Sequence, residues 1–305
     1  MTVTGQLDSC LRVAAWFTLL RPVHWVKNLF VLAPLLFAQQ LFAADLLVSA
    51  LVAMLLFCML SSSVYIYNDV QDAGQDRMHP LKARRPIAAG QIQPTLAMIV
   101  GMVMAVLALA AAFVLDHRFG LIGLAYLIVN VLYSRWLKRV AFLDAGIIAT
   151  GFVFRVVGGA LAIDVVVSVW LVVCTFCLAC LLAFGKRRHE LETVVASPSG
   201  ELNQSRPALA GYSVASLRLV EWILAGITVL SYLLYTIAPG TMEKFHTHNL
   251  VFTLPFPVLG ILRYLQLVRA KRDKTPTESL VTDIPTLANL ACWVAVVILV
   301  LYWNS

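Results

Sequence analysis

The sequence has few charged residues. Only 16 of its 305 residues are Asp or Glu and 23 are Lys or Arg, so charged side chains make up 13% of the chain, about half the share of a soluble domain. Hydrophobic residues make up 61%. This composition excludes a soluble globular domain, and a nucleic-acid partner is not expected for so apolar a chain, despite its net charge of +7.

Cysteine is also scarce, with six in the chain. Cys174, Cys177 and Cys180 step by three inside an apolar stretch, which resembles a ligand spacing. No cluster of His or Cys stands near them in the sequence, and thiols buried in lipid need no bridge. We therefore interpret them as small residues that pack between helices.

Long apolar runs recur along the chain, and each is long enough to cross a bilayer. They predict an all-α, polytopic membrane protein that forms one integral membrane unit over residues 1–305. The expected spans are 26–43, 46–67, 94–115, 119–134, 141–161, 166–184, 214–236, 249–268 and 284–303.

Basic residues gather after the even-numbered spans. Arg135, Lys138 and Arg139 follow the fourth span, for example, whereas the opposite connections carry only Arg118 and Lys244. Because positively charged loops stay in the cytoplasm, we expect the N-terminus and the even-numbered connections on that side of the membrane. Contact with anionic membrane lipids explains part of this charge.

Acidic residues are concentrated in one short motif after the second apolar run. Asn68, Asp69, Asp72 and Asp76 are spaced so that they fall on or near one face if the helix continues. Clustered carboxylates repel one another and persist only with compensating cations. Hard oxygen ligands suit Mg²⁺, which binds through one or two carboxylates and completes its shell with water and substrate phosphate. The alternative is a solvated acidic loop.

A basic cluster follows the sixth apolar run. Lys186 and Arg187 precede Glu190 at helical spacing, so the three face one side of a helix. One acid among several cations favours a polyphosphate ligand, although the cations could be topology anchors. A bundle that brings spans two and six together would place the acidic motif opposite these residues.

Arg155 falls near the middle of the fifth span, where a charged side chain is costly and is by default a functional candidate. The structural alternative is an ion pair with Asp144 or Asp164. Lys27 opens the first span, where interfacial anchoring would explain it equally well.

The stretch Asn68–Asp76 resembles the NDxxDxxxD motif of the UbiA-type intramembrane prenyltransferases, and Tyr133 to Lys138 is similar to their tyrosine–lysine signature. The resemblance covers nearly the whole chain. It implies nine transmembrane helices around a central cavity with cytoplasmic cap loops.

One departure from the family pattern narrows the resemblance. The usual second motif, DxxxD, is replaced by Gly185-Lys186-Arg187-Arg188-His189-Glu190, which contains one acid. With Arg21-Pro22 through Asn28 and His79-Pro80 through Gly90, this resembles the decaprenyl-phosphate phosphoribosyltransferase branch.

The branch implies a pentosyltransferase of the plasma (inner) membrane. It would transfer 5-phosphoribose from phosphoribosyl pyrophosphate to a polyprenyl (decaprenyl) phosphate, for cell-wall arabinan precursors. A site for two anionic substrates should contain more bases than acids, as the second cluster does.

On this interpretation Asp69, Asp72 and Asp76 are catalytic and hold Mg²⁺, helped by Asn68. The residues expected to bind the donor and other phosphates are Lys27, Asn68, Arg85, Tyr133, Lys138, Arg155, Lys186, Arg187 and Glu190. The alternatives are an aromatic or quinone prenyltransferase that uses prenyl diphosphate, and a non-enzymatic transporter or lipid flippase. The sequence is compatible with a homo-oligomer and fixes neither the oligomeric state nor the acceptor length.

Overall fold

The computed structural model describes residues 13–78, 82–196, 207–270, 279–280 and 282–303. Within these ranges the chain is helical with no strand, and eight helices are long and apolar enough to cross a membrane. The predicted all-α membrane fold is confirmed. The chain divides into two compact units, residues 1–135 with 154–166, and residues 136–153 with 167–305.

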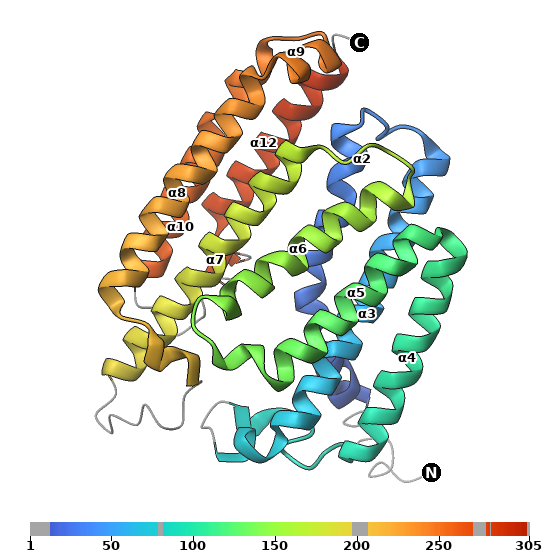
Figure 1. Cartoon of the computed structure of the whole chain (residues 1–305), viewed down its shortest axis with the longest axis vertical. Coiled ribbons are helices and arrows are strands. Elements are labelled where there is room, and N and C mark those ends of the chain that lie inside the picture. The colour runs from blue at the N-terminus through green and yellow to red at the C-terminus, as the bar shows by residue number, and fades with distance from the viewer. Residues whose placement is uncertain (1–12, 79–81, 197–206, 271–278, 281, 304–305) are drawn as a thin grey trace. The chain divides into compact units, whose positions relative to one another are not determined.

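The first unit is built around one long helix. Its elements are η1 (Pro22–Leu32), α2 (Ala33–Phe37), α3 (Ala44–Met78), η2 (Lys82–Arg84), α4 (Pro94–Leu115), α5 (His117–Arg135) and the later part of α6 (Leu143–Ala162). Figure 1 shows α3, α4 and α5 side by side. Phe57 of α3 meets Phe119 and Tyr126 of α5 edge to face, and these rings form the centre of a buried cluster.

The predicted first span, residues 26–43, is wrong, because these residues do not form one continuous α-helix. The chain instead forms the 3-10 helix η1, followed by the short helix α2. Pro22 and Pro34 stand in the first turns of these two helices, where proline is tolerated but fixes the backbone. The Val31 carbonyl oxygen lies 2.0 Å from the position that a Cβ on Gly159 would occupy, so η1 packs directly on α6 backbone.

Helix α3 is longer than the predicted second span, residues 46–67. It runs 35 residues to Met78 and carries the whole acidic motif. The helical interpretation of the motif is confirmed, and the alternative of a solvated acidic loop is wrong, because the whole motif lies on α3. His79 and Pro80, part of the resemblance, lie outside the described residues.

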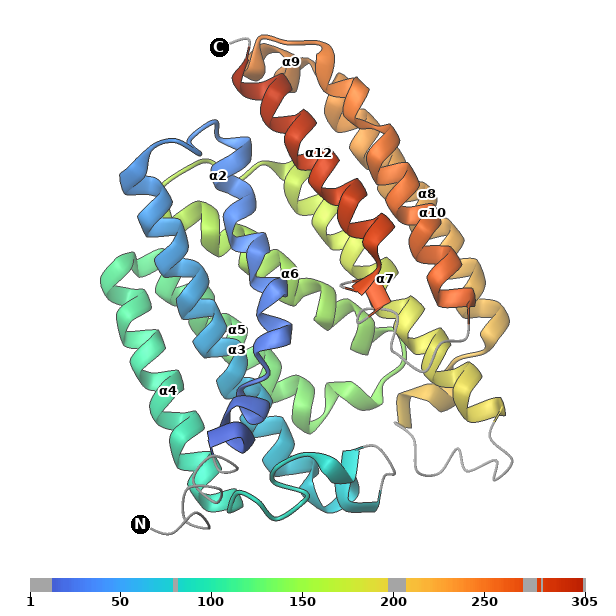
Figure 2. The same cartoon turned by 180° about the vertical axis from the view of Figure 1, so that it is seen from behind.

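The second unit contains η3 (Leu137–Arg139), the first part of α6, α7 (Val169–Ala196), η5 (Pro207–Gly211), α8 (Val214–Ile237), α9 (Pro239–Phe245), η6 (Asn249–Thr253), α10 (Pro255–Arg269) and α12 (Ile284–Tyr302). Figure 2 shows α8, α10 and α12 lying together. Ser213 caps α8 through a capping box with Ser216, and Asp283 caps α12. Helix α7 continues past its apolar run and carries the basic cluster.

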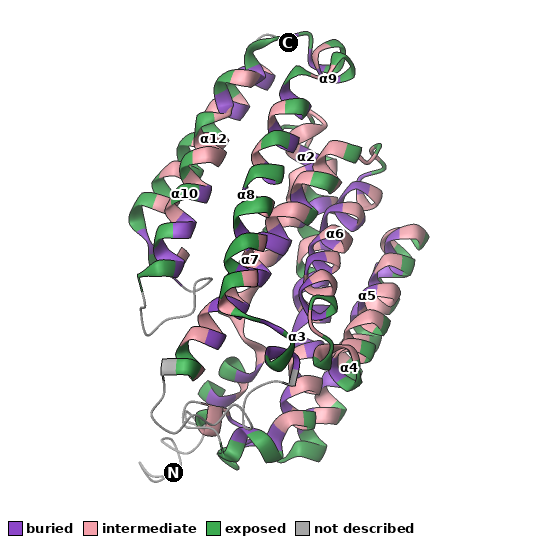
Figure 3. Ribbon diagram, turned by 60° about the vertical axis from the view of Figure 1, so that its left-hand side comes forward, coloured by how far each residue is buried: buried purple, intermediate pink, exposed green. Residues whose placement is uncertain are grey.

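Burial differs strongly among the helices (Figure 3). In the most apolar 18-residue stretch of α3, 56% is buried, compared with 17% in the corresponding stretches of α4 and α12. Apolar side chains exposed along α4 and α12 suit contact with lipid. Helix α3 is thus the buried axis of the first unit, and the acidic motif is at its C-terminal end.

Candidate active site

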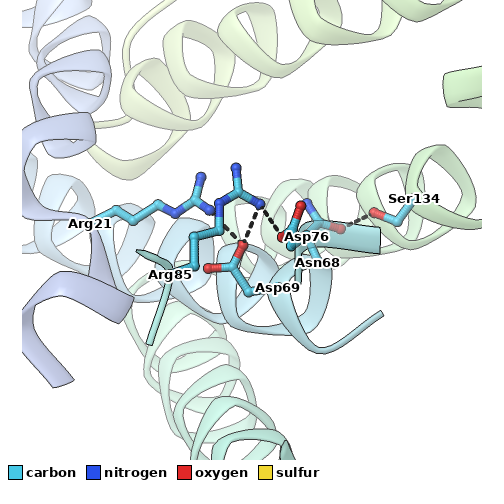
Figure 4. Close-up of polar contacts among 6 residues, drawn as sticks. All are labelled: Arg21, Asn68, Asp69, Asp76, Arg85 and Ser134. Atoms are coloured by element: carbon cyan, nitrogen blue, oxygen red, sulfur yellow. Dashed lines mark hydrogen bonds and ion pairs between the residues drawn. The ribbon is translucent and has the colours of Figure 1, made fainter. Parts of the chain in front are cut away.

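The acidic motif forms a network of carboxylates and guanidinium groups (Figure 4). Asp69 and Asp76 are only 2% and 3% exposed. One nitrogen of Arg85, Nη1, lies 3.1 Å from Asp69 Oδ1 and 2.7 Å from Asp76 Oδ2. A single arginine therefore joins the two acids, which lie two turns apart on one face of α3, as the spacing predicted.

A second arginine, which the sequence interpretation did not assign to the site, reaches the same carboxylate. Arg21 Nη2 donates to Asp69 Oδ1 at 2.5 Å, and its guanidinium carbon lies 5.1 Å from the centre of the Tyr65 ring. Arg21 has φ 54° and ψ 57°, a left-handed conformation that is uncommon for a residue other than glycine. Its place in the quoted motif, directly before Pro22, was the available signal.

Small polar residues of α3 hold the segment that carries Arg21. Trp25 Nε1 donates to Ser62 Oγ at 2.9 Å, and Ser62 Oγ donates to the Leu20 carbonyl oxygen at 2.8 Å. Three residues after Trp25, Asn28 Nδ2 donates to Ser61 Oγ at 3.3 Å. These bonds satisfy polar groups in an apolar setting and fix the direction of the Arg21 side chain.

Arg85 is positioned by apolar packing of the connection that follows it. Ile87 and Ile92 are buried in a cluster with Ile66 of α3. A turn with φ 73° at Gly90 returns this connection toward α4. The buried isoleucines therefore hold the connection against α3 and place Arg85 above the acids.

The end of α5 is fastened to the same part of α3. Ser134 Oγ is hydrogen-bonded to Asn68 Oδ1, and Arg135 Nε donates to the Tyr67 hydroxyl at 2.8 Å. The predicted site residue Tyr133 lies beside these contacts in sequence and is half-buried, as is Asp72. Ser134 is another residue of this site that the sequence interpretation missed.

The donor chemistry of this end of α3 fits Mg²⁺. Within the described part of the chain, no three His, Cys, Asp or Glu side chains converge on a ready-made metal site. Two carboxylates bridged by a guanidinium supply hard oxygen ligands, and Mg²⁺ commonly uses only one or two carboxylates with water and substrate phosphate. The metal role of Asp69, Asp72 and Asp76 therefore stays a prediction.

Arg155 lies in a separate buried polar cluster of the first unit. Its Nε donates to Asn28 Oδ1 at 2.6 Å, and its Nη2 donates to the Tyr126 hydroxyl at 3.3 Å. The acids considered as its partners have others: Asp144 accepts from Arg187 and Asp164 from Arg118. Lys27 is half-buried on η1, next to Asn28.

The basic cluster of α7 contains a buried ion-pair network in the second unit. Arg187 is 1% exposed. Its Nε lies 2.5 Å from Asp144 Oδ2, and its Nη1 donates to Glu190 Oε2 at 2.7 Å. The Tyr212 hydroxyl donates to Asp144 Oδ1 at 2.6 Å. Burial and this bond raise the pKa of Tyr212, so it stays a neutral donor.

The next residue, Arg188, forms an ion pair with a residue of another helix. It is 2% exposed, and its Nε donates to Glu221 Oε1 of α8 at 2.8 Å. Lys186 is half-buried at the start of the cluster, and Lys138 is half-buried on η3. Asp144 and Glu221 were not predicted as partners of this cluster, because the acids lie far from it in sequence.

The eight predicted site residues of the first unit are Lys27, Asn68, Asp69, Asp72, Asp76, Arg85, Tyr133 and Arg155. Contacts join Asp69, Asp76 and Arg85 directly. The second unit holds Lys138, Lys186, Arg187 and Glu190, of which Arg187 and Glu190 are in contact. That the acidic motif faces the basic cluster stays a prediction.

Known proteins are similar to nearly the whole chain. The model of the UbiA prenyltransferase family matches residues 28–293. The chain belongs to the UbiA prenyltransferase family. It is 30% identical to the decaprenyl-phosphate phosphoribosyltransferase of Mycolicibacterium smegmatis, over 93% of this chain and 91% of that protein. The protein of that name from Corynebacterium glutamicum is 27% identical, over 93% and 85% respectively.

Solved structures support the fold. A UbiA homolog from Archaeoglobus fulgidus, bound to DMAPP and Mg²⁺, gives a TM-score of 0.71 at 18% identity, over 94% of this chain and 98% of that one. The resemblance to the family and to its phosphoribosyltransferase branch is confirmed, and so is the assignment as a transferase. The chain is an integral membrane protein.

Proposed function

We propose that this protein transfers 5-phosphoribose from phosphoribosyl pyrophosphate to a polyprenyl phosphate, with Mg²⁺ as its cofactor. The product is a polyprenyl-phosphoryl 5-phosphoribose, a precursor for cell-wall arabinan. The observation that carries the proposal is the array of Asp69 and Asp76 with Arg21 and Arg85 at the end of α3. Such an array suits a metal-bound diphosphate, and curated relatives carry the corresponding name.

The charge of the second cluster also supports a donor with several phosphates. Lys186 and the single acid Glu190 stand where a prenyl diphosphate enzyme of this family would carry two aspartates. Arg187 is buried against Asp144 and holds Glu190 at 2.7 Å, so we assign it to positioning Glu190. Lys186 and Glu190 would then contact the donor's phosphate and ribose.

In the proposed reaction the bond from ribose C1 to the diphosphate oxygen breaks as a phosphate oxygen of the lipid bonds to C1 from the opposite face. Asp69, Asp72 and Asp76 would hold Mg²⁺, which when bound neutralises charge on the departing diphosphate. Arg85 would donate to phosphate oxygens whose negative charge grows as the bond breaks. The lipid phosphate is already ionised at neutral pH, so no strong general base is needed.

The remaining predicted residues would complete the phosphate contacts. Asn68, held by Ser134, would face the donor, and Tyr133, Lys138 and Lys27 would contact phosphate. Arg155, held between Asn28 and Tyr126, would bind the acceptor's phosphate. We place this chemistry at the cytoplasmic side of the plasma (inner) membrane, because basic residues follow the even-numbered spans and positively charged connections favour that side.

A transfer assay with two alternative donors tests the proposal. Purified protein in detergent with Mg²⁺ is given labelled phosphoribosyl pyrophosphate and polyprenyl phosphate, or a labelled prenyl diphosphate and an aromatic acid. We expect label from the first donor in the organic phase. Transfer only from prenyl diphosphate would identify an aromatic prenyltransferase, and no transfer from either would leave the transporter alternative.

Two matched variants tie activity to the acidic motif. Asp76→Asn should lower turnover by at least about 100-fold, since a metal ligand and a partner of Arg85 are lost together. Asp45→Asn changes an exposed acid in the first turn of the same helix and should leave turnover unchanged. Full turnover of Asp76→Asn would contradict the metal mechanism.

A further inference from the structure

Arg21 belongs to the charged array at the end of α3, but the reaction steps above give it no action of its own, although it makes the shorter of the two arginine contacts to Asp69. The geometry points to Arg21 and Arg85 as counter-ions that exchange one anionic partner for another, an inference that rests on the proposed function. They neutralise Asp69 and Asp76 while no donor is bound, and they move onto the donor's phosphate oxygens when metal and donor bind together. Arg21 is therefore a donor-binding residue.

The first support is the charge balance at the two acids. Asp69 and Asp76 are almost fully buried, and a buried carboxylate needs a partner cation. Arg21 and Arg85 both reach Asp69 through the same oxygen, Oδ1, at 2.5 Å and 3.1 Å. Two guanidinium charges thus balance two carboxylates without a metal ion.

The second support is that the arginines are accessible where the acids are not. Their side chains are 22% and 29% exposed, compared with 2% for Asp69. A long arginine side chain can turn its head group by several ångströms while its backbone stays fixed. The face of Tyr65 lies under the Arg21 guanidinium, and the cation–π contact favours retention of the charge near the site.

The third support is the backbone of Arg21. A left-handed conformation is unfavourable for a residue other than glycine, and the residue before a proline such as Pro22 favours an extended backbone. The hydrogen bonds of Trp25 and Ser62 hold this segment in place. Strained conformations of this kind cluster at ligand sites. Here the strain directs a cation at the acidic motif.

These contacts put the arginine in competition with the metal. A divalent cation held by Asp69 would place a second positive charge beside the Arg21 guanidinium, and their repulsion would favour release of the guanidinium from the carboxylate. Metal alone leaves the arginine without its partner, whereas a donor diphosphate supplies new acceptors for the displaced head group. Metal and donor therefore bind cooperatively, and the arginine contributes to the coupling.

Removing Arg21 should then have opposite effects on the two ligands. Arg21→Gln should bind Mn²⁺ alone about tenfold more tightly, because a competing positive charge is gone. The same variant should bind phosphoribosyl pyrophosphate in the presence of Mn²⁺ at least about tenfold more weakly, because a phosphate contact is lost. If Arg21 had only a structural role, its removal would weaken the binding of both ligands.

The test measures Mn²⁺ by the electron paramagnetic resonance signal of the free ion and donor binding by equilibrium dialysis of labelled phosphoribosyl pyrophosphate. Arg118→Gln is the matched control, because Arg118 lies at the start of α5, away from the site residues, and pairs with the exposed Asp164. It should change neither constant by more than about twofold. Arg21→Lys keeps the positive charge and replaces Arg21→Gln in the test if that variant does not fold. It should leave the dissociation constant for Mn²⁺ near that of the native protein and weaken the binding of the donor.

The outcomes separate the two proposals. Opposite shifts in Arg21→Gln, with an unchanged control, support the exchange. If both constants weaken together, or neither moves, the exchange is overturned while the proposed function stands. If the native protein with Mn²⁺ does not bind phosphoribosyl pyrophosphate at all, both proposals are overturned.

Discussion

The buried pair between Arg187 and Asp144 makes a sharp prediction about stability. Asp144 is 0% exposed, and its oxygens face Arg187 at 2.5 Å and the Tyr212 hydroxyl at 2.6 Å. Removing one partner of a buried pair costs about 3–5 kcal/mol when the remaining charge has no other partner. Arg187 keeps Glu190 at 2.7 Å, so we expect a cost near the lower end of that range. Asp144→Asn should therefore lower the apparent Tm by roughly 10 °C in a chain of this size.

A matched variant separates burial from charge. Asp164 also pairs with an arginine, Arg118, at 2.8 Å, but its side chain is 84% exposed. Asp164→Asn removes the same charge and should leave the Tm nearly unchanged, because exposed pairs contribute little. Asparagine also tolerates the left-handed backbone at this position.

Thermal unfolding of both variants in the same detergent, followed by loss of the monodisperse peak, gives the comparison. The double variant Asp144→Leu with Arg187→Met should recover much of the loss, since an apolar pair of similar volume can replace a buried ion pair. Equal Tm values for Asp144→Asn and the native protein would refute the assignment of Arg187 to a structural pair.

Two further predictions concern the helices. Gly159→Ala should lower the Tm sharply, because its Cβ would lie 2.0 Å from the Val31 carbonyl oxygen, whereas Gly146→Ala in the same helix meets nothing within 4 Å and should raise it; equal effects in a thermal scan would contradict this packing. Hydrogen bonds from Arg263 lower the pKa of Asp283, so this carboxylate stabilises the fold above its unfolded pKa and the contribution is lost as pH falls through the folded value. The Tm deficit of Asp283→Asn should therefore be clear at neutral pH and shrink in strong acid, and a constant deficit would contradict the pairing.

The sequence predicted the membrane fold because hydrophobic length alone identifies spanning segments. It failed for the first span, where the chain forms η1 and α2 and Val31 of η1 packs against the backbone of α6 at Gly159. Such a contact joins residues far apart in sequence and leaves no periodic signal. The sequence alone left open whether the helix continues through Asp76, and the structure shows that α3 does so.

The acidic half of the site was predictable because Asp69 and Asp76 repeat at helical spacing. Their counter-ions were only partly predictable. Arg85 lies in the same connection, but Arg21 is 48 positions away and reaches Asp69 only after the first segment packs on α3. Likewise, the residues around Arg187 in the sequence do not indicate that it pairs with Asp144, 43 positions earlier.

A reaction with two labels tests the central claim most directly. Phosphoribosyl pyrophosphate carrying ³H in the ribose and ³²P in the diphosphate is incubated with the protein, Mg²⁺ and polyprenyl phosphate, and the phases are separated. The account predicts ³H in the lipid and an equal amount of ³²P released as pyrophosphate into water, with both lost in Asp76→Asn. Entry of ³²P into the lipid, or transfer of ³H that persists without a divalent cation, would contradict it.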